Sequence, residues 1–171
     1  MRAYDRRLSL RPETAHRMAI LAMDQFGWAL AYLIPGAARC TGLGGPAQDG
    51  VVSVLLPAAL LAERDPLPAS WTVTSDSIAA WVAGAAGARR LVLMKPVAGL
   101  YRAWPPAGEP IGRLTVEELA ALRPAGVDEH LPAALRAARV ETWVIDGREP
   151  ERIAELLDRG RPVGTQITAA A

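Results

Sequence analysis

Two ionisable side chains, a carboxylate and an amine, stand near the middle of the chain at the ends of two expected elements. Asp76 follows Thr74 and Ser75, residue types that favour a helix N-terminus, and apolar residues recur after it at helical spacing. Lys95, the only lysine of the chain, follows the apolar run 91–94, which is typical of a buried strand. Open parallel sheets bind ligands beyond the carboxyl ends of their strands. The pair therefore predicts a ligand site, although a plain helix cap and a solvated lysine also explain these two residues.

The rest of the chain predicts helices that alternate with strands. A capping box of Thr115 and Glu118 opens one helix, and Asp128 is expected to cap the next. The expected helices cover 11–33, 58–62, 74–86, a segment beginning at 115, 128–138 and 150–158, and the expected strands cover 51–56, 91–94 and 140–145. This alternation favours an α/β fold with a parallel sheet and right-handed crossovers.

An apolar stripe marks the face of the first long helix that we expect to be buried: Ala15, Met18, Ala19, Ala22, Met23, Phe26 and Leu30. His16 lies beside this stripe as a core or interface histidine. The glycine-rich segment 41–50 is interpreted as a flexible connection, because no strand precedes it and no Lys-Ser/Thr follows its glycines. The segment 102–112, which contains three prolines, is expected to be an exposed excursion.

Length and composition indicate one globular domain over 1–171. The 171 residues are 51% hydrophobic and 22% charged, with a formal net charge of +1 and no basic block. This balance argues against a nucleic-acid or membrane surface. Cys40 is the only cysteine, and no His, Cys or carboxylate set has metal-ligand spacing. A cytoplasmic location is the default expectation.

Three blocks of sequence carry a family resemblance. They are T-S-D-S-I-A-A-W-V-A from Thr74, G-A-R-R-L-V-L-M-K-P-V-A-G-L-Y from Gly87, and W-V-I-D-G from Trp143 with G-T-Q-I from Gly164. In this order they resemble the amino acid kinase superfamily, which includes acetylglutamate, aspartate and uridylate kinases. The resemblance implies an αβα sandwich with a mostly parallel sheet. It also implies an ATP-dependent kinase that transfers the γ-phosphoryl group to a carboxylate or phosphate-monoester acceptor, with Mg²⁺ held mostly by the ATP phosphates.

The same resemblance assigns roles at the start of the central helix. It implies that Asp76 is catalytic and orients the lysines that neutralise the transferring phosphoryl group. Phosphoryl transfer depends on in-line positioning and on cations near the developing charge. Thr74 and Ser75 would border the acceptor pocket, or they would only cap the helix.

The resemblance places the nucleotide after the central strand. It implies that Lys95 contacts the ATP phosphates or ribose, and that Gly99 and Tyr101 shape the turn against the nucleotide. Gly99 has an alternative use as a residue of positive φ. Pro96 and Ala98 stand where the family often carries acids, which leaves the details of nucleotide contact open.

The chain lacks the opening segments of that family. It has neither a strand bearing K-x-G-G nor a second strand ending in a Gly-Gly-Gly turn, and residues 123–130 contain no lysine. Either the natural protein begins upstream of Met1, or the chain is short and serves as a relic or a binding subunit. Unpaired strands would leave such a chain marginally stable.

Three functions remain open from the sequence. The blocks A-H-R-M-A-I-L-A-M-D-Q-F-G and V-D-E-H-L-P are most similar to the short kinases of methanofuran-type cofactor synthesis, which act on an aminomethylfuran methyl phosphate. A catalytically inactive subunit with a nucleotide-binding or assembly role is the alternative, and an unrelated α/β binding module is the third. The resemblance further implies a small-molecule substrate and a homo-oligomer.

Overall fold

The computed structural model describes residues 1–44 and 50–168 and divides the chain into two compact units. The first unit is Met1–Trp71 and the second is Thr72–Ala171. That both belong to one domain stays a prediction. Half of the glycine-rich segment expected to be a connection, residues 45–49, lies outside the described residues.

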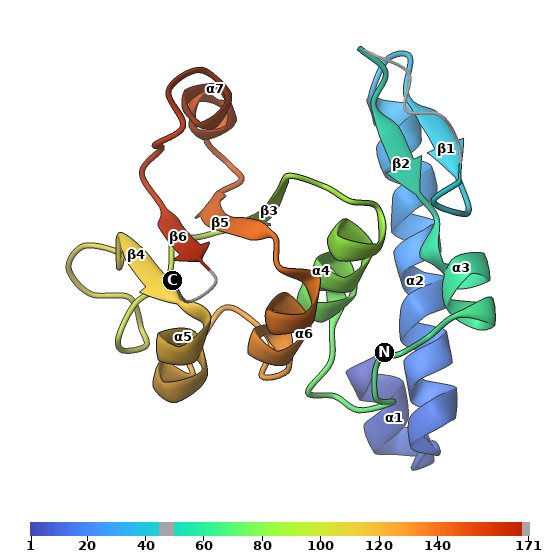
Figure 1. Cartoon of the computed structure of the whole chain (residues 1–171). Helices are drawn as coiled ribbons and strands as arrows, with labels where there is room; N and C mark the ends of the chain where they lie inside the picture. The colour runs from blue at the N-terminus through green and yellow to red at the C-terminus, as the bar shows by residue number, and fades with distance from the viewer. Residues whose placement is uncertain (45–49, 169–171) are drawn as a thin grey trace. The chain divides into compact units, whose positions relative to one another are not determined.

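The first unit is built on one long helix. Its elements are α1 (Arg2–Leu8), α2 (Pro12–Leu33), β1 (Ala38–Cys40), β2 (Ser53–Leu55) and α3 (Pro57–Glu63). Strands β1 and β2 pair in parallel, and α3 lies along α2 (Figure 1). Pro12 and Pro57 stand at helix starts, where a missing backbone N–H costs nothing. The long helix is confirmed, whereas the strand predicted over 51–56 is shorter.

The buried face of α2 agrees with the predicted stripe at Ala15 and departs from it toward the helix end. Phe26 is 70% exposed and Leu30 is 37% exposed, so their expected burial is wrong. The helix instead buries a face with small residues that includes Gly27 and Ala31. A Cβ atom at position 27 would lie 2.7 Å from the Leu56 Cδ2 atom. Close backbone approach explains the glycine at position 27, whereas Ile20 on the same helix is a large buried side chain.

The second unit is a mixed α/β layer structure. Its elements are α4 (Ser75–Ala85), β3 (Arg90–Lys95), β4 (Arg113–Thr115), α5 (Val116–Leu122), α6 (Leu131–Ala138), β5 (Glu141–Asp146), α7 (Pro150–Arg159) and β6 (Thr165–Thr168). The sheet order is β3-β5-β6-β4, with β3 parallel to β5, β4 parallel to β6, and β5 antiparallel to β6. The mostly parallel α/β fold is confirmed, and the capping box of Thr115 and Glu118 is present.

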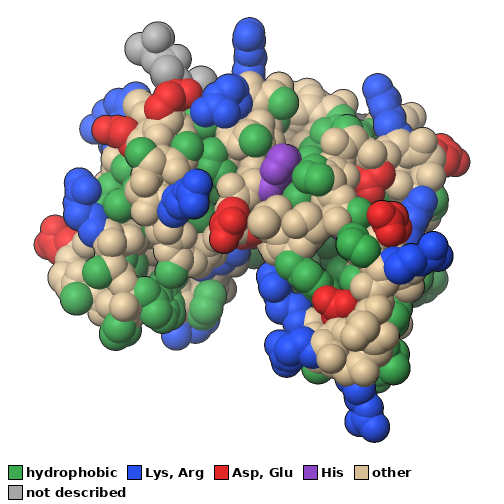
Figure 2. Space-filling view, turned by 90° about the horizontal axis from the view of Figure 1, so that it is seen from below, with side chains coloured by type: hydrophobic (Ala, Val, Ile, Leu, Met, Phe, Trp, Pro, Cys, Tyr) green, Lys and Arg blue, Asp and Glu red, His purple; other side chains and the backbone are tan. Residues whose placement is uncertain are grey.

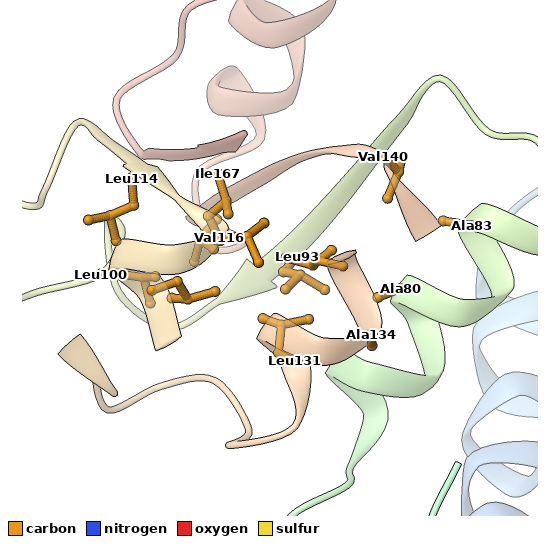
Figure 3. Close-up of a cluster of buried hydrophobic side chains, with 13 residues drawn as sticks. Ala80, Ala83, Leu93, Leu100, Leu114, Val116, Leu131, Ala134, Val140 and Ile167 are labelled. Atoms are coloured by element: carbon orange, nitrogen blue, oxygen red, sulfur yellow. The ribbon is translucent and has the colours of Figure 1, made fainter. Parts of the chain in front are cut away.

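Alternating side chains of β5 separate the two faces of this sheet. Val144 belongs to the larger core. Figure 3 shows this core, to which helices α4, α5 and α6 contribute together with the strands. Trp143 and Ile145 lie on the opposite face and pack with Leu156 of α7. The second unit therefore has helices on both faces of its sheet, as the predicted αβα arrangement requires.

Helices α4 and α6 cross closely at a glycine. A Cβ atom at Gly84 would lie 2.8 Å from the Cα and Cβ atoms of Ala138. Short connections then lead from each helix into a parallel strand, α4 into β3 and α6 into β5. The N-terminal ends of both helices therefore meet the carboxyl ends of both strands, which we call the carboxyl edge of the sheet.

Several large apolar side chains of α2 are exposed, among them Trp28, Tyr32 and Leu33. On the face shown in Figure 2, basic side chains are dispersed among acidic and apolar ones. Within residues 1–44 and 50–168, no helix is long and apolar enough to cross a membrane.

Candidate functional site

The carboxyl edge of the sheet holds an ion pair between the two residues that the sequence singles out. Asp76 is the second residue of α4, and Lys95 is the last residue of β3. The Lys95 Nζ atom lies 2.7 Å from Asp76 Oδ1 and 2.8 Å from Oδ2. The two side chains are 8% (Asp76) and 20% (Lys95) exposed. The structure thus brings the predicted acid and amine together at one partly accessible point.

The ammonium group of Lys95 keeps capacity for a further acceptor. A lysine ammonium has three N–H donors and no acceptor. The carboxylate of Asp76 engages it with both oxygens. One remaining N–H on a partly exposed cation suits a single phosphate oxygen, so the residues present fit the nucleotide that the resemblance implies.

Asp128 is the residue that sequence reasoning placed wrongly. Helix α6 begins at Leu131 with His130 as its N-cap residue, so Asp128 does not cap it. Its carboxylate instead accepts hydrogen bonds from the start of α4. The donors are the backbone N–H of Thr74 at 2.9 Å, the Thr74 hydroxyl at 2.9 Å, the backbone N–H of Ser77 at 3.0 Å, and the Ser77 hydroxyl. The residue types gave no signal for a contact across more than fifty positions.

Asp128 also touches the ion pair directly. Its backbone N–H donates to Asp76 Oδ2 at 3.3 Å. Ser77, which the sequence analysis did not select, is fully buried and bonded to Asp128. Thr74 contacts Asp128 through its hydroxyl group, whereas Ser75 is exposed. Their predicted place beside an acceptor stays a prediction.

The loop after β3 is held against the sheet by a buried threonine. The Thr165 hydroxyl accepts from the Leu100 backbone N–H at 2.8 Å. A Cβ atom at Gly99 would lie 2.7 Å from the Thr165 Oγ1 atom, and Gly99 is not among the residues of positive φ. The positive-φ alternative for Gly99 is therefore wrong, and close approach explains this glycine. Tyr101, which follows Leu100, is half-buried.

A second carboxylate at the carboxyl edge belongs to a local turn. Asp146 is the register partner of Lys95 on β5. Arg148 donates to Asp146 through Nε at 2.9 Å, through a terminal guanidinium nitrogen at 2.6 Å and through its backbone N–H at 2.9 Å. The side-chain hydrogen bond from Arg148 is the main cause that lowers the pKa of Asp146 to about 2. Asp146 is therefore fully ionised and already paired.

A hollow of about 250 Å³ opens between α5 and α6 beside Asp128. Its wall combines apolar residues such as Leu119 and Val127 with Arg123 and Arg136, and Asp128 contributes to it. Thus Asp128 lies between this hollow and the ion pair. In the part of the chain that the structure describes, no three His, Cys, Asp or Glu residues are grouped to hold a metal ion.

Comparisons with known proteins agree with this fold. The profile of the Amino acid kinase family matches residues 45–146, which include the whole ion pair. The second unit, with its mostly parallel sheet covered by helices, defines an α/β protein. The chain belongs to the amino acid kinase family, and the curated relatives that it matches are kinases.

Two curated relatives illustrate the range of the match. The [5-(aminomethyl)furan-3-yl]methyl phosphate kinase of Methanocaldococcus jannaschii is 26% identical over 98% of this chain and 77% of the relative. The acetylglutamate kinase of Acidothermus cellulolyticus is 37% identical over 70% of this chain. The chain spans only 43% of that acetylglutamate kinase.

Solved structures support the same fold. The uridylate kinase of Archaeoglobus fulgidus has a TM-score of 0.70 and 21% identity, covering 97% of this chain and 77% of that one. The UMP kinase of Ureaplasma parvum has a TM-score of 0.66 and 13% identity, covering 97% and 76%. At these identities the likeness concerns the fold alone.

Proposed function

We propose that the protein is an ATP-dependent small-molecule kinase with its reaction centred on the ion pair of Asp76 and Lys95. The observation that carries this proposal is the bidentate contact of these side chains, at 2.7 Å and 2.8 Å, at the carboxyl edge of the sheet. The family membership of the chain adds the reaction class.

The chemistry asked of these residues is electrostatic. In a kinase reaction an acceptor oxygen bonds to the γ-phosphorus, and the bond to the bridging oxygen breaks to release ADP. Charge accumulates on the transferring oxygens, and a preorganised cation stabilises it. Lys95 supplies that cation, and Asp76 holds its ammonium group in one place. Mg²⁺ is expected to be held mostly by the ATP phosphates.

For the acceptor we propose a phosphate monoester with an aminomethylfuran ring. The relative that covers nearly all of this chain is named for that substrate. A carboxylate acceptor is the second choice, because acetylglutamate kinases also match.

The test is phosphoryl transfer by the purified 171-residue chain, followed by ³¹P NMR. ATP, Mg²⁺ and [5-(aminomethyl)furan-3-yl]methyl phosphate are expected to give ADP and a diphosphate, whereas N-acetylglutamate and UMP give less product. Asp76→Asn is expected to lower kcat by about a hundred- to a thousandfold, the cost of losing one transition-state interaction. Glu109→Gln, in the exposed loop after β3, is the matched charge control.

Two outcomes would count against the proposal. Nucleotide binding without transfer to any of the three acceptors favours an inactive subunit. Equal kcat in Asp76→Asn and Glu109→Gln would remove the ion pair from the reaction.

A further inference from the structure

The carboxylate of Asp128 occupies the start of α4 in the way that an N-cap side chain normally does. It accepts the backbone N–H groups of Thr74 and Ser77, which the helix itself cannot satisfy. Thr74 is the N-cap residue and has a side chain suited to capping, yet it makes no capping bond of its own. Its hydroxyl donates to Asp128 instead. A distant residue thus replaces the local cap.

The same residue fixes Asp76 from a second direction. The backbone N–H of Asp128 lies 3.3 Å from Asp76 Oδ2, the oxygen that also lies 2.8 Å from Lys95 Nζ. Asp76 sits between Thr74 and Ser77, so the first turn of α4 is held at both sides of the carboxylate. Asp128 therefore restrains the helix turn through its side chain and the Asp76 carboxylate through its backbone.

The charge of Asp128 and its hydrogen bonds to α4 should have opposite effects on the binding of an anionic ligand. A second carboxylate beside Lys95 and Asp76 adds negative charge where an anionic ligand is expected, and by Coulomb's law alone it weakens anion binding. Its four hydrogen bonds from the start of α4 instead hold the helix turn in place. Removal of the Asp128 charge should therefore strengthen anion binding if its electrostatic effect dominates, and weaken anion binding if its hydrogen bonds to α4 dominate.

We propose that Asp128 is a positioning residue for the ion pair. It orients the first turn of α4 so that both oxygens of Asp76 meet Lys95, and this leaves the third N–H of Lys95 directed at a phosphate oxygen. The identity of that phosphate rests on the proposed function, whereas the placement of Lys95 does not.

The unique lysine of the chain provides a direct readout. Protein made with ¹³C,¹⁵N-labelled lysine carries one labelled side chain, Lys95, in all 171 residues. Its NMR signal is compared in the wild type, Asp128→Asn and Asp76→Asn, and inorganic tripolyphosphate is titrated into each. Glu129→Gln is the matched control, because this exposed neighbour undergoes the same change of charge.

We expect the Lys95 signal of Asp128→Asn to move at least halfway to that of Asp76→Asn, while Glu129→Gln keeps the wild-type signal. Tripolyphosphate binding by Asp128→Asn should weaken about three- to tenfold, the range for one lost hydrogen-bonding interaction. A wild-type Lys95 signal in folded Asp128→Asn, or tighter tripolyphosphate binding, would overturn the proposal.

A second variant covers the case in which Asp128→Asn does not fold. Ser77→Ala removes one hydroxyl donor to Asp128 and leaves every charge in place. The Lys95 signal is then expected to move in the same direction by a smaller amount, and an unchanged signal contradicts the proposal. Absence of phosphoryl transfer in all forms would refute the proposed function only, since the Lys95 signal does not depend on turnover.

Discussion

Asp76 and Lys95 form a different kind of contact from the exposed ion pair of Arg136 with Glu117. Arg136 with Glu117 is more than half exposed on both sides, and an exposed pair of this kind contributes about 0–1 kcal/mol. Asp76 is only 8% exposed. A buried carboxylate that loses its counter-ion is unfavourable, so Lys95 stabilises Asp76 in the ligand-free fold. The two residues of the proposed reaction thus also contribute to the stability of the ligand-free fold.

Asp146 leads to a prediction about acid stability. Because Arg148 holds the pKa of Asp146 at about 2, below its ordinary 3.8, the unfolded chain takes up a proton before the folded chain does. The resulting stabilisation is complete above the unfolded pKa and is lost as the pH falls toward the folded value. We expect Asp146→Asn to lose less stability than the wild type between about pH 4 and about pH 2.

The measurement is the urea midpoint at a series of acidic pH values. Asp158→Asn, an exposed position near the end of α7, serves as the matched control and should follow the wild type. Identical acid dependence in Asp146→Asn and wild type would show that Arg148 does not perturb Asp146.

At the scale of elements, the crossing of α4 and α6 depends on Gly84. A Cβ atom there would lie 2.8 Å from the Ala138 Cα atom, which is backbone and cannot rotate away. Gly84→Ala gains up to about 1 kcal/mol in helix propensity, but overpacking costs about 1–3 kcal/mol. We expect a net loss of about 1 kcal/mol in the free energy of unfolding, measured with urea.

A matched glycine tests the cause of that loss. A Cβ atom at Gly42 would have no neighbour within 4 Å among the described residues, and the φ of Gly42 is not positive. Gly42→Ala should therefore change stability by less than about 0.5 kcal/mol. If Gly84→Ala is more stable than the wild type, the helices can separate at little cost.

Much of this element structure could be predicted from local sequence. Pro12, Pro150 and the capping box at Thr115 mark helix starts that the structure confirms, because these signals act within one turn. Short strands such as β1 and β4 were not predicted, since three residues hold little periodicity. The antiparallel pairing of β6 with β5 also depends on tertiary contacts.

The residues of the candidate site also differ in how far local sequence could predict their roles. Asp76 and Lys95 could be selected because each ends an element that the sequence marks clearly. Asp128 could not be assigned, because its residue type suits a cap for the nearby α6 as well as for the distant α4. Only the packing of the two helices, which Gly84 permits, decides between these partners.

At the scale of the whole molecule, the two compact units permit a test of where a nucleotide acts. Asp76 and Lys95 both belong to the second unit, Thr72–Ala171. A ligand that binds only the folded form stabilises it by about 2.7 kcal/mol at a hundredfold excess over Kd. We expect Mg²⁺ and ATP at this excess to slow amide hydrogen exchange about a hundredfold at core positions of the second unit such as Leu93 and Val144, where exchange requires unfolding.

Two controls locate the nucleotide. Amide exchange at Ile20, in the first unit, should slow by a smaller factor. In Lys95→Met, Mg²⁺ and ATP should no longer slow exchange in either unit. Equal protection of Ile20 and Val144 would mean that the nucleotide also stabilises the first unit, and protection that survives Lys95→Met would move the phosphate site away from the ion pair.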